Sequence, residues 1–369
     1  MLALPLAALA ADWPQFLGPT RNGLYSGTDV AGAWPKDGPL RVWQMTVGAG
    51  FSGPVAQTGK VILFHRLEDK EVVDCLKATD GARLWRFEYP TGYADDFGFD
   101  NGPRAAPTIA AGKVFTFGAE GTLHALDFET GRKIWSISVK DQLQAPKGFF
   151  GMACSPLFAD GKVLLNVGGA EDAGIVAFEA GTGQLVWRAT ADEASYASPV
   201  AAMIEGKFRA IFFTRSGLVV LDPATGRIEF EFSWRARAHA SVNAATPLVK
   251  DDSIFLSASY GTGAVLLQVK GKALEKVWSS DDALSSHYAT PVERNGFLYG
   301  FHGRQEYGQS LRCLEWKTGK VRWSKEGFGA GSLILLGESV ACPDGEWRTG
   351  VLGRFTGGLS RSGQSAAFG

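Results

Sequence analysis

The chain has 369 residues, 45% of them hydrophobic, and its 37 Lys and Arg residues against 38 Asp and Glu residues give a formal net charge of −1. A nearly neutral chain lacks the basic surface that binds nucleic acid or an anionic membrane, so we expect neither partner. Its 47 glycines and 11 tryptophans suit many short strands joined by tight turns.

The first eleven residues are apolar and end in Ala8-Leu9-Ala10, a small-x-small pattern typical of a leader cleavage site. We therefore predict a signal peptide remnant over residues 1–11, which is too short to span a bilayer, and a periplasmic or secreted mature protein. Residues 12–39 are predicted to form an N-terminal lead-in to a single domain.

One pattern then recurs six times: a glycine turn, a short apolar run and a tryptophan or phenylalanine. The aromatic ends fall at residues 85, 135, 187, 230, 278 and 323, a period typical of propeller blades and of helical arrays. A small residue followed by proline precedes each apolar run, and these runs are broken by Gly, Asp and Asn turns. Such short runs indicate strands, so the period favours a propeller.

The second repeat resolves into four strands, at residues 108–110, 114–117, 123–128 and 133–139. A lone four-stranded meander cannot bury both faces, so blades must stack radially around a channel. We predict an all-β β-propeller of four-stranded blades over residues 40–340. It would have six clear blades and a truncated seventh that begins near Ser332.

The motif Ala-x-Asp-x-x-Thr-Gly-x-x-x-Trp, nearly whole between Ala125 and Trp135, resembles the repeat of PQQ-like (pyrroloquinoline-quinone-type) propellers. The opening from Asp12 to Pro19, with Arg21-Asn22-Gly23, is similar to the start of secreted members of that group. The resemblance implies eight blades, each with a tryptophan docked over the turn of the next blade. It assigns this structural role to Trp85, Trp135, Trp187, Trp278 and Trp323.

This family contains quinoprotein dehydrogenases and non-catalytic scaffolds that assist outer-membrane assembly. The dehydrogenases carry an adjacent Cys-Cys pair beside the quinone, a calcium site and a catalytic Asp. The four cysteines here, at 75, 154, 313 and 342, are isolated, and no run of Asp and Asn resembles a calcium loop. The resemblance thus favours a non-catalytic binding scaffold with no catalytic residue, metal or cofactor. The alternative is a PQQ-dependent quinoprotein oxidoreductase.

Polar residues precede the predicted innermost strands, at the channel mouth where propellers usually bind ligands. His287 and Tyr288 precede Thr290-Pro291, and Arg304 lies in a turn of the sixth repeat. The corresponding entry positions of other repeats carry Asn101, Arg104, Tyr196, Ser241 and Asn243. We predict that these residues bind a protein or a small polar ligand. Solvated turns around a water-filled channel are the alternative explanation.

From about Ala341 the strand alternation ends, and we predict an irregular tail over residues 341–369. Our hypothesis is a frameshift near residue 340 that removes most of a seventh blade and an eighth. Residues 40–47 resemble the last strand of a blade without its first three strands. We therefore expect this segment to border an open gap in the ring, with an unpaired edge.

Overall fold

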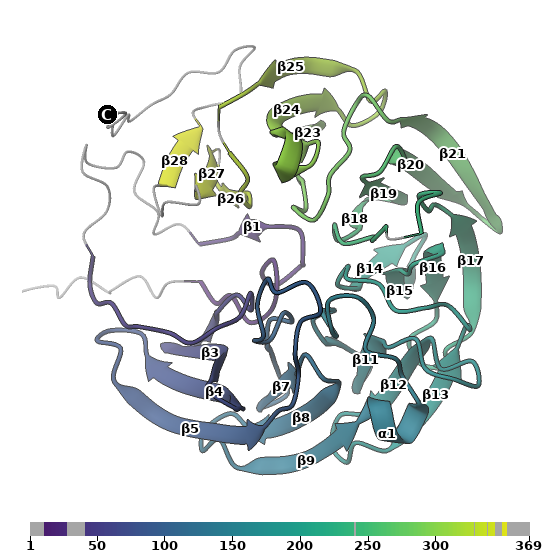
Figure 1. The fold of residues 1–369 in the computed structure, drawn as a ribbon. Helices are drawn as coiled ribbons and strands as arrows, with labels where there is room; N and C mark the ends of the chain where they lie inside the picture. The colour runs from purple at the N-terminus through teal and green to yellow at the C-terminus, as the bar shows by residue number, and fades with distance from the viewer. Residues whose placement is uncertain are drawn as a thin grey trace, which may run out of the picture.

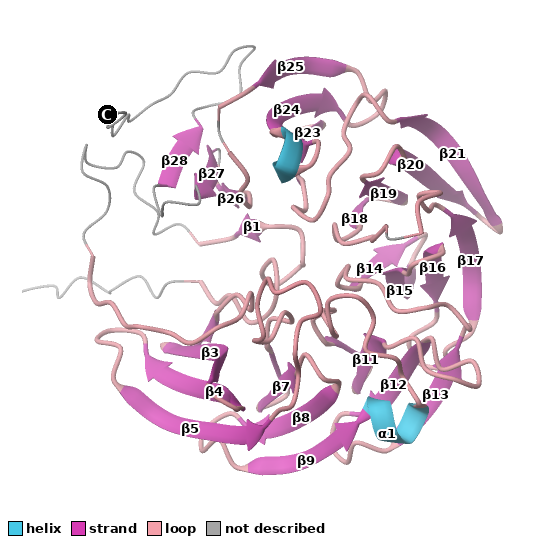
Figure 2. Cartoon of the chain, viewed as in Figure 1, coloured by secondary structure: helices cyan, strands magenta, loops and turns pink. Residues whose placement is uncertain are grey.

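Seven four-stranded sheets surround a central axis in the computed structural model, which describes residues 11–27, 41–239, 241–327, 329–337, 339–343 and 349–352 (Figure 1). The predicted all-β propeller of four-stranded blades is therefore confirmed. Helical structure in these residues is confined to α1 (Val139–Leu143) and a 3-10 turn, η1 (Gln305–Tyr307), both in connecting segments (Figure 2).

Six blades follow one another along the chain, and each is an antiparallel meander that runs from the axis outward. Their strands are, in blade 1, β2 (Val55–Gln57), β3 (Lys60–Leu67), β4 (Lys70–Lys77) and β5 (Arg83–Pro90); in blade 2, β6 (Thr108–Ala110), β7 (Lys113–Phe117), β8 (Thr122–Asp127) and β9 (Lys133–Ser138); in blade 3, β10 (Leu157–Ala159), β11 (Lys162–Asn166), β12 (Ile175–Glu179) and β13 (Leu185–Ala189). They continue, in blade 4, with β14 (Val200–Ile204), β15 (Lys207–Phe213), β16 (Gly217–Leu221) and β17 (Ile228–Ser233); in blade 5, with β18 (Leu248–Lys250), β19 (Ser253–Ala258), β20 (Gly263–Lys270) and β21 (Ala273–Ser280); in blade 6, with β22 (Val292–Arg294), β23 (Phe297–His302), β24 (Ser310–Glu315) and β25 (Val321–Lys325).

The hydrophobic core lies between neighbouring blades. One buried cluster, for example, joins Ile62 and Val73 of blade 1 to Ile109, Val114 and Leu126 of blade 2. Similar clusters join each following pair of blades up to blades 6 and 7, so blades 2 to 6 bury both faces against their neighbours.

Tryptophans fasten consecutive blades together. The indole Nε1 of Trp135 donates to the carbonyl of Ala180 in the next blade at 3.1 Å, and its ring lies against Gly183. That glycine has a φ of +75°, and a Cβ there would lie 2.8 Å from the indole Cδ2, so only glycine fits both the turn and the ring. Trp85, Trp187 and Trp278 make the same pair of contacts with the following blade.

A β-bulge sets the tryptophan in place. In blade 2, Ala125 lies opposite Trp135 and Leu126 lies opposite Lys133, so Ile134 is an extra residue in the outer strand. The same irregularity occurs between the third and fourth strands of blades 1, 3, 4, 5 and 6. Such a bulge bends the strand and re-aims its side chains toward the neighbouring turn.

Two of the repeats depart from this docking pattern. Blade 4 has Phe230 in place of tryptophan, and no atom lies within 4 Å of a Cβ built at Gly271 in the following blade. Trp323 of blade 6 packs in a cluster with Tyr299, at a ring-centroid distance of 6.1 Å. Among the described residues it makes no hydrogen bond to a following turn.

The seventh blade differs from the expected truncated one. Its strands are β26 (Ile334–Leu336), β27 (Ser339–Pro343) and β28 (Thr349–Leu352), and the N-terminal strand β1 (Leu24–Tyr25) pairs in parallel with β26. Strand β1, which lies within the predicted lead-in, is therefore the first strand of blade 7. The expectation of an irregular tail is wrong for residues 341–343 and 349–352, and residues 353–369 lie outside the described part.

Residues 41–47 form no strand, but Trp43 docks as the repeat tryptophans do. Its Nε1 donates to the carbonyl of Ala78 at 2.8 Å, and its ring lies against Gly81 of blade 1. Figure 1 shows this segment on the side of the ring between blade 7 and blade 1. Leu40 lies outside the described residues, and no described strand pairs with residues 41–47.

No helix in the described part of the chain is long and apolar enough to cross a membrane.

Candidate functional site

One end of the propeller carries most of the long connections. In an antiparallel meander, the loop between the second and third strands and the connection to the next blade lie at the same end. We call this end the loop face. The predicted channel-mouth residues lie there, because they precede the innermost strands or, for Arg304, follow a second strand.

The chain's own N-terminal segment runs between the two ends of the channel. Asp12 Oδ1 accepts from the Thr58 N–H in a turn at the opposite end, and Arg21 lies at the loop face. Trp13 pairs with Ala56 of blade 1, and the carbonyl of Pro14 accepts from the Ile109 N–H of blade 2. Arg21 follows, and only 2% of it is exposed. The chain then returns as β1 along blade 7.

Arg21 links three blades through its guanidinium. It donates to Thr108 Oγ1 of blade 2 at 3.2 Å, to the Ser155 and Pro156 carbonyls at blade 3, and to the Pro199 carbonyl at the start of blade 4 at 2.8 Å. Its Nε donates to Gln15 Oε1 at 2.8 Å. Burial lowers the pKa of Arg21 to about 9, so it remains protonated at neutral pH. The channel mouth is thus bridged by a buried cation that the sequence analysis did not single out.

The predicted residues from the first four repeats mainly hold loops in place. Arg104 donates to the Asp100 carbonyl at 2.6 Å and stacks on Tyr93, with 4.6 Å from its guanidinium carbon to the ring centroid. The side chain of Asn101 accepts from the Asp95 N–H at 2.8 Å. The hydroxyl of Tyr196 accepts from the N–H groups of Phe149 and Phe150 at 2.9 and 3.1 Å.

Ser241 and Asn243 are buried rather than open to a ligand. The Asn243 amide donates to the Thr214 carbonyl at 2.9 Å and the Trp234 carbonyl at 3.1 Å. Its backbone carbonyl accepts from Ser195 Oγ and from the Tyr196 and Ala197 N–H groups. The hydrogen bonds of Asn243 therefore stabilise the connection between blades 4 and 5.

The residues predicted from the later repeats lie apart from this group, between blades 5 and 6. His287 is buried, and its Nδ1 lies 3.0 Å from Gln305 Oε1 while its Nε2 lies 2.8 Å from the Tyr260 hydroxyl. Because the amide oxygen can only accept, Nδ1 carries a proton, and Nε2 shares the second hydrogen bond with the Tyr260 hydroxyl. Tyr288 is exposed beside it, with a ring-centroid distance of 5.4 Å.

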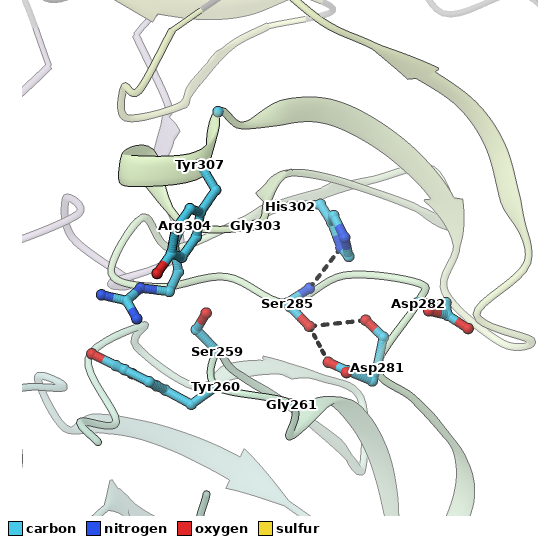
Figure 3. Close-up of a pocket in the computed structure, with 11 residues that line it drawn as sticks. Ser259, Tyr260, Gly261, Asp281, Asp282, Ser285, His302, Gly303, Arg304 and Tyr307 are labelled. Carbon is cyan, nitrogen blue, oxygen red and sulfur yellow. Dashed lines mark hydrogen bonds between the residues drawn. The ribbon is translucent and has the colours of Figure 1, made fainter. Parts of the chain in front are cut away.

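A polar pocket of about 440 Å³ is lined by Tyr260, the hydrogen-bond partner of His287 (Figure 3). Arg304 lies on one side of it, 4.7 Å from the Tyr260 ring centroid and 5.5 Å from that of Tyr307, and it pairs with Glu306 at 2.8 Å. On the other side, Ser285 N–H donates to His302 Nδ1 at 3.1 Å. Burial lowers the pKa of His302, so that ring is neutral near pH 7. The remaining lining residues are Ser259, Gly261, Asp281, Asp282, Gly303 and Gly308.

The sequence analysis missed a group of phenylalanines on the loop face of blades 1 to 3. Phe51, Phe97 and Phe99 are 64%, 54% and 70% exposed. The rings of Phe97 and Phe150 lie 5.0 Å apart between centroids, and Phe149 and Phe150 lie 6.4 Å apart. We call these five residues the aromatic surface. The signal was present as Phe97-Gly98-Phe99 and Phe149-Phe150, aromatic residues in Gly- and Asp-rich connections outside any predicted strand.

The described residues contain no group of three or more His, Cys, Asp and Glu side chains arranged to hold a metal ion. Cys75, Cys154 and Cys313 are buried free thiols, and burial raises the pKa of Cys75 and of Cys154 to about 11. The side chain of Cys342 lies outside the described part. The three thiols are therefore packing residues in their blades.

Radially stacked four-stranded blades with docked tryptophans define a propeller of PQQ-like repeats. A family model described as "Outer membrane protein assembly factor BamB" matches residues 68–325, more than half of the chain. The chain belongs to this family, and the resemblance that we drew from the repeat motif is confirmed.

Two curated proteins show how far the similarity extends. BamB of Yersinia pestis is 20% identical over 277 residues, which are 72% of this chain and 67% of that protein. The dehydrogenase subunit of a quinone-type alcohol dehydrogenase from Gluconobacter oxydans (strain 621H) is 35% identical over 120 residues. That match covers 31% of this chain and 16% of that protein. The match to BamB thus extends over most of both chains, and the match to the dehydrogenase is local.

Solved structures of both kinds share the fold. BamB from Moraxella catarrhalis superposes with a TM-score of 0.56 at 19% identity, covering 81% of this chain and 80% of that chain. Quinohemoprotein alcohol dehydrogenase ADHIIG from Pseudomonas putida HK5 also gives 0.56, at 13% identity, covering 79% of this chain and 62% of that chain. At these identities the two superpositions establish the architecture.

Proposed function

We propose that this chain is a non-catalytic scaffold of the bacterial envelope that holds a protein partner on the surface of its propeller. The observation that carries the proposal is the bridge across the channel mouth. Small ligands of propellers commonly enter the channel. Here Arg21 is buried at that entry and bonds to blades 2, 3 and 4.

The distribution of polar groups supports the same function. Asn243, His287 and Arg104 were predicted to contact a ligand, but their hydrogen bonds hold the loops of the chain itself. The solvent-facing part of the loop face is instead rich in phenylalanine rings, and aromatic residues are enriched in protein interfaces. The similarity to BamB over 72% of the chain agrees with an assembly role, a periplasmic location and no resident cofactor in this proposal.

Site-specific photocrosslinking in living bacteria tests the proposal. The photoreactive amino acid p-benzoylphenylalanine would replace exposed residues at both ends of the propeller, such as Phe99 and Phe208, which are 70% and 45% exposed. A scaffold should give a discrete protein adduct in the envelope fraction from at least one end. If neither end of a folded, exported chain gives an adduct, the scaffold function is wrong.

A further inference from the structure

We propose that the aromatic surface docks an acidic protein segment whose apolar side chains pack on the phenylalanine rings. This inference rests on the proposed scaffold function and names the surface and the chemistry of the partner. Its basis is the position of the five phenylalanines and the charges at their border.

Hydrogen bonds fix the backbone of the loops that carry the aromatic surface. Phe99 N–H donates to Asp95 Oδ2 at 2.7 Å, which fixes the turn that carries Phe97 and Phe99. Tyr196 holds the backbone of Phe149 and Phe150, as described above. These loops therefore present their rings from a fixed backbone, which lowers the entropy lost on binding.

Most charges inside the aromatic surface are already compensated. Lys147 pairs with Asp96 at 2.7 Å, and Arg215 pairs with Glu193 at 3.0 Å. The carboxylate of Asp100 accepts from the Gly50 N–H at 3.2 Å and from the Gly102 N–H at 2.6 Å. A partner that docks here therefore contacts phenylalanine rings and side chains that are already ion-paired or hydrogen-bonded.

The border toward blade 5 is cationic. We call residues 234–239 the basic loop, in which Arg235 and Arg237 are exposed and make no hydrogen bond or ion pair with any described residue. This loop touches the aromatic surface, since the His239 ring lies 6.1 Å from that of Phe149 between centroids. Arg215 stacks on Phe149 at 4.9 Å and donates to the His239 carbonyl, so it joins the two areas.

Apolar rings beside the exposed guanidinium groups of Arg235 and Arg237 complement a segment that carries apolar side chains next to carboxylates. An anionic membrane would also meet the arginines. We favour a protein segment because the proposed function is a scaffold that holds a protein partner, and the lipid vesicles in the test below separate the two.

Fluorescence anisotropy with defined peptides tests the docking. The probes are a labelled peptide of alternating Phe and Asp, the same peptide with Lys in place of Asp, and one with Ser in place of Phe. We expect the Phe-Asp peptide to bind the full chain at least about tenfold more tightly than either of the others, a difference of about 1.4 kcal/mol. Its affinity should fall as salt rises.

Two variants and a matched control locate the site. The double change Phe97→Ser and Phe99→Ser should weaken binding of the Phe-Asp peptide about tenfold or more. The double change Arg235→Glu and Arg237→Glu should weaken it and reduce its salt dependence. The control, Met203→Ser with Phe208→Ser, removes exposed apolar groups at the opposite end of blade 4 and should leave binding unchanged. Unshifted melting temperatures would show that these surface variants remain folded.

Three results would overturn the docking proposal: no preference for the Phe-Asp peptide, an equal loss in the control variant, or binding to anionic lipid vesicles that depends on Phe97 and Phe99. A photocrosslink from Phe208 but none from Phe99 would also overturn it, and the scaffold function would stand. Absence of crosslinks from both ends would contradict the proposed scaffold function itself.

Discussion

The contact between a docked tryptophan and the glycine of the next blade should make Gly183 much less tolerant of a methyl group than Gly271. Both glycines have positive φ, +75° and +60°, so alanine at either position carries the same left-handed strain of about 1–2 kcal/mol. They differ in what surrounds the new methyl group. At Gly183 it would lie 2.8 Å from Trp135 Cδ2, and at Gly271 no atom lies within 4 Å.

Gly183→Ala must therefore displace the indole. Overpacking of this kind costs about 1–3 kcal/mol, and loss of the Trp135 hydrogen bond to Ala180 adds about 1 kcal/mol. We expect Gly183→Ala to lower the free energy of unfolding by about 3–6 kcal/mol and Gly271→Ala by about 1–2 kcal/mol. Trp135→Ala alone should cost about 3–5 kcal/mol through lost packing and the cavity that it leaves.

Chemical denaturation of the four proteins and of the double variant Trp135→Ala/Gly183→Ala completes the test. In the absence of the indole, Gly183→Ala should cost no more than Gly271→Ala, because only the left-handed strain remains. Equal costs for Gly183→Ala and Gly271→Ala in the wild-type background would show that the indole contact does not fasten the blades.

The blades could be predicted because their signals are local. A glycine turn, a strand pair and a docking tryptophan fall within about one blade of sequence. They therefore recur at the same spacing in successive repeats and can be recognised from the sequence. The strands of blade 2 match the predicted ranges to within a residue at most ends, and β6 (Thr108–Ala110) matches fully. Trp43 obeys the same local rule, although the strand expected around it is absent from the described residues.

Features that depend on distant pairing were missed. Strand β1 (Leu24–Tyr25) has two residues and no periodicity, and only its pairing with β26, some 310 residues later, defines it. Arg21 gave no signal because an arginine in a polar turn is usually exposed, and its burial depends on carbonyl and hydroxyl acceptors from three other repeats. The aromatic surface likewise gathers loops from three blades.

Three further perturbations test the channel bridge, the absence of quinone chemistry and the buried histidine. Arg21→Met leaves the Ser155 and Pro199 carbonyls without this donor, so it should cost about 2–4 kcal/mol in denaturation experiments, and an unchanged midpoint would show that the bridge is dispensable. Added PQQ and calcium should give no dye-linked oxidation of alcohols or aldose sugars, whereas turnover that requires the quinone would favour the oxidoreductase alternative. His124 is 4% exposed and packs on Tyr89 and Phe87, and burial lowers its pKa to about 3. The unfolded chain binds a proton at this residue below about pH 6.5 and the folded chain does not, so His124 makes the protein less stable as pH falls from 6.5 toward 3, by about 1.4 kcal/mol per pH unit. Burial raises the pKa of nearby Glu71, which opposes this trend, but wild type and a His124→Phe variant share that group. The variant should therefore gain stability relative to the wild type as the pH falls from 7 to 4.5. A difference in unfolding free energy that stays constant over this range would show that His124 does not remain neutral in the fold.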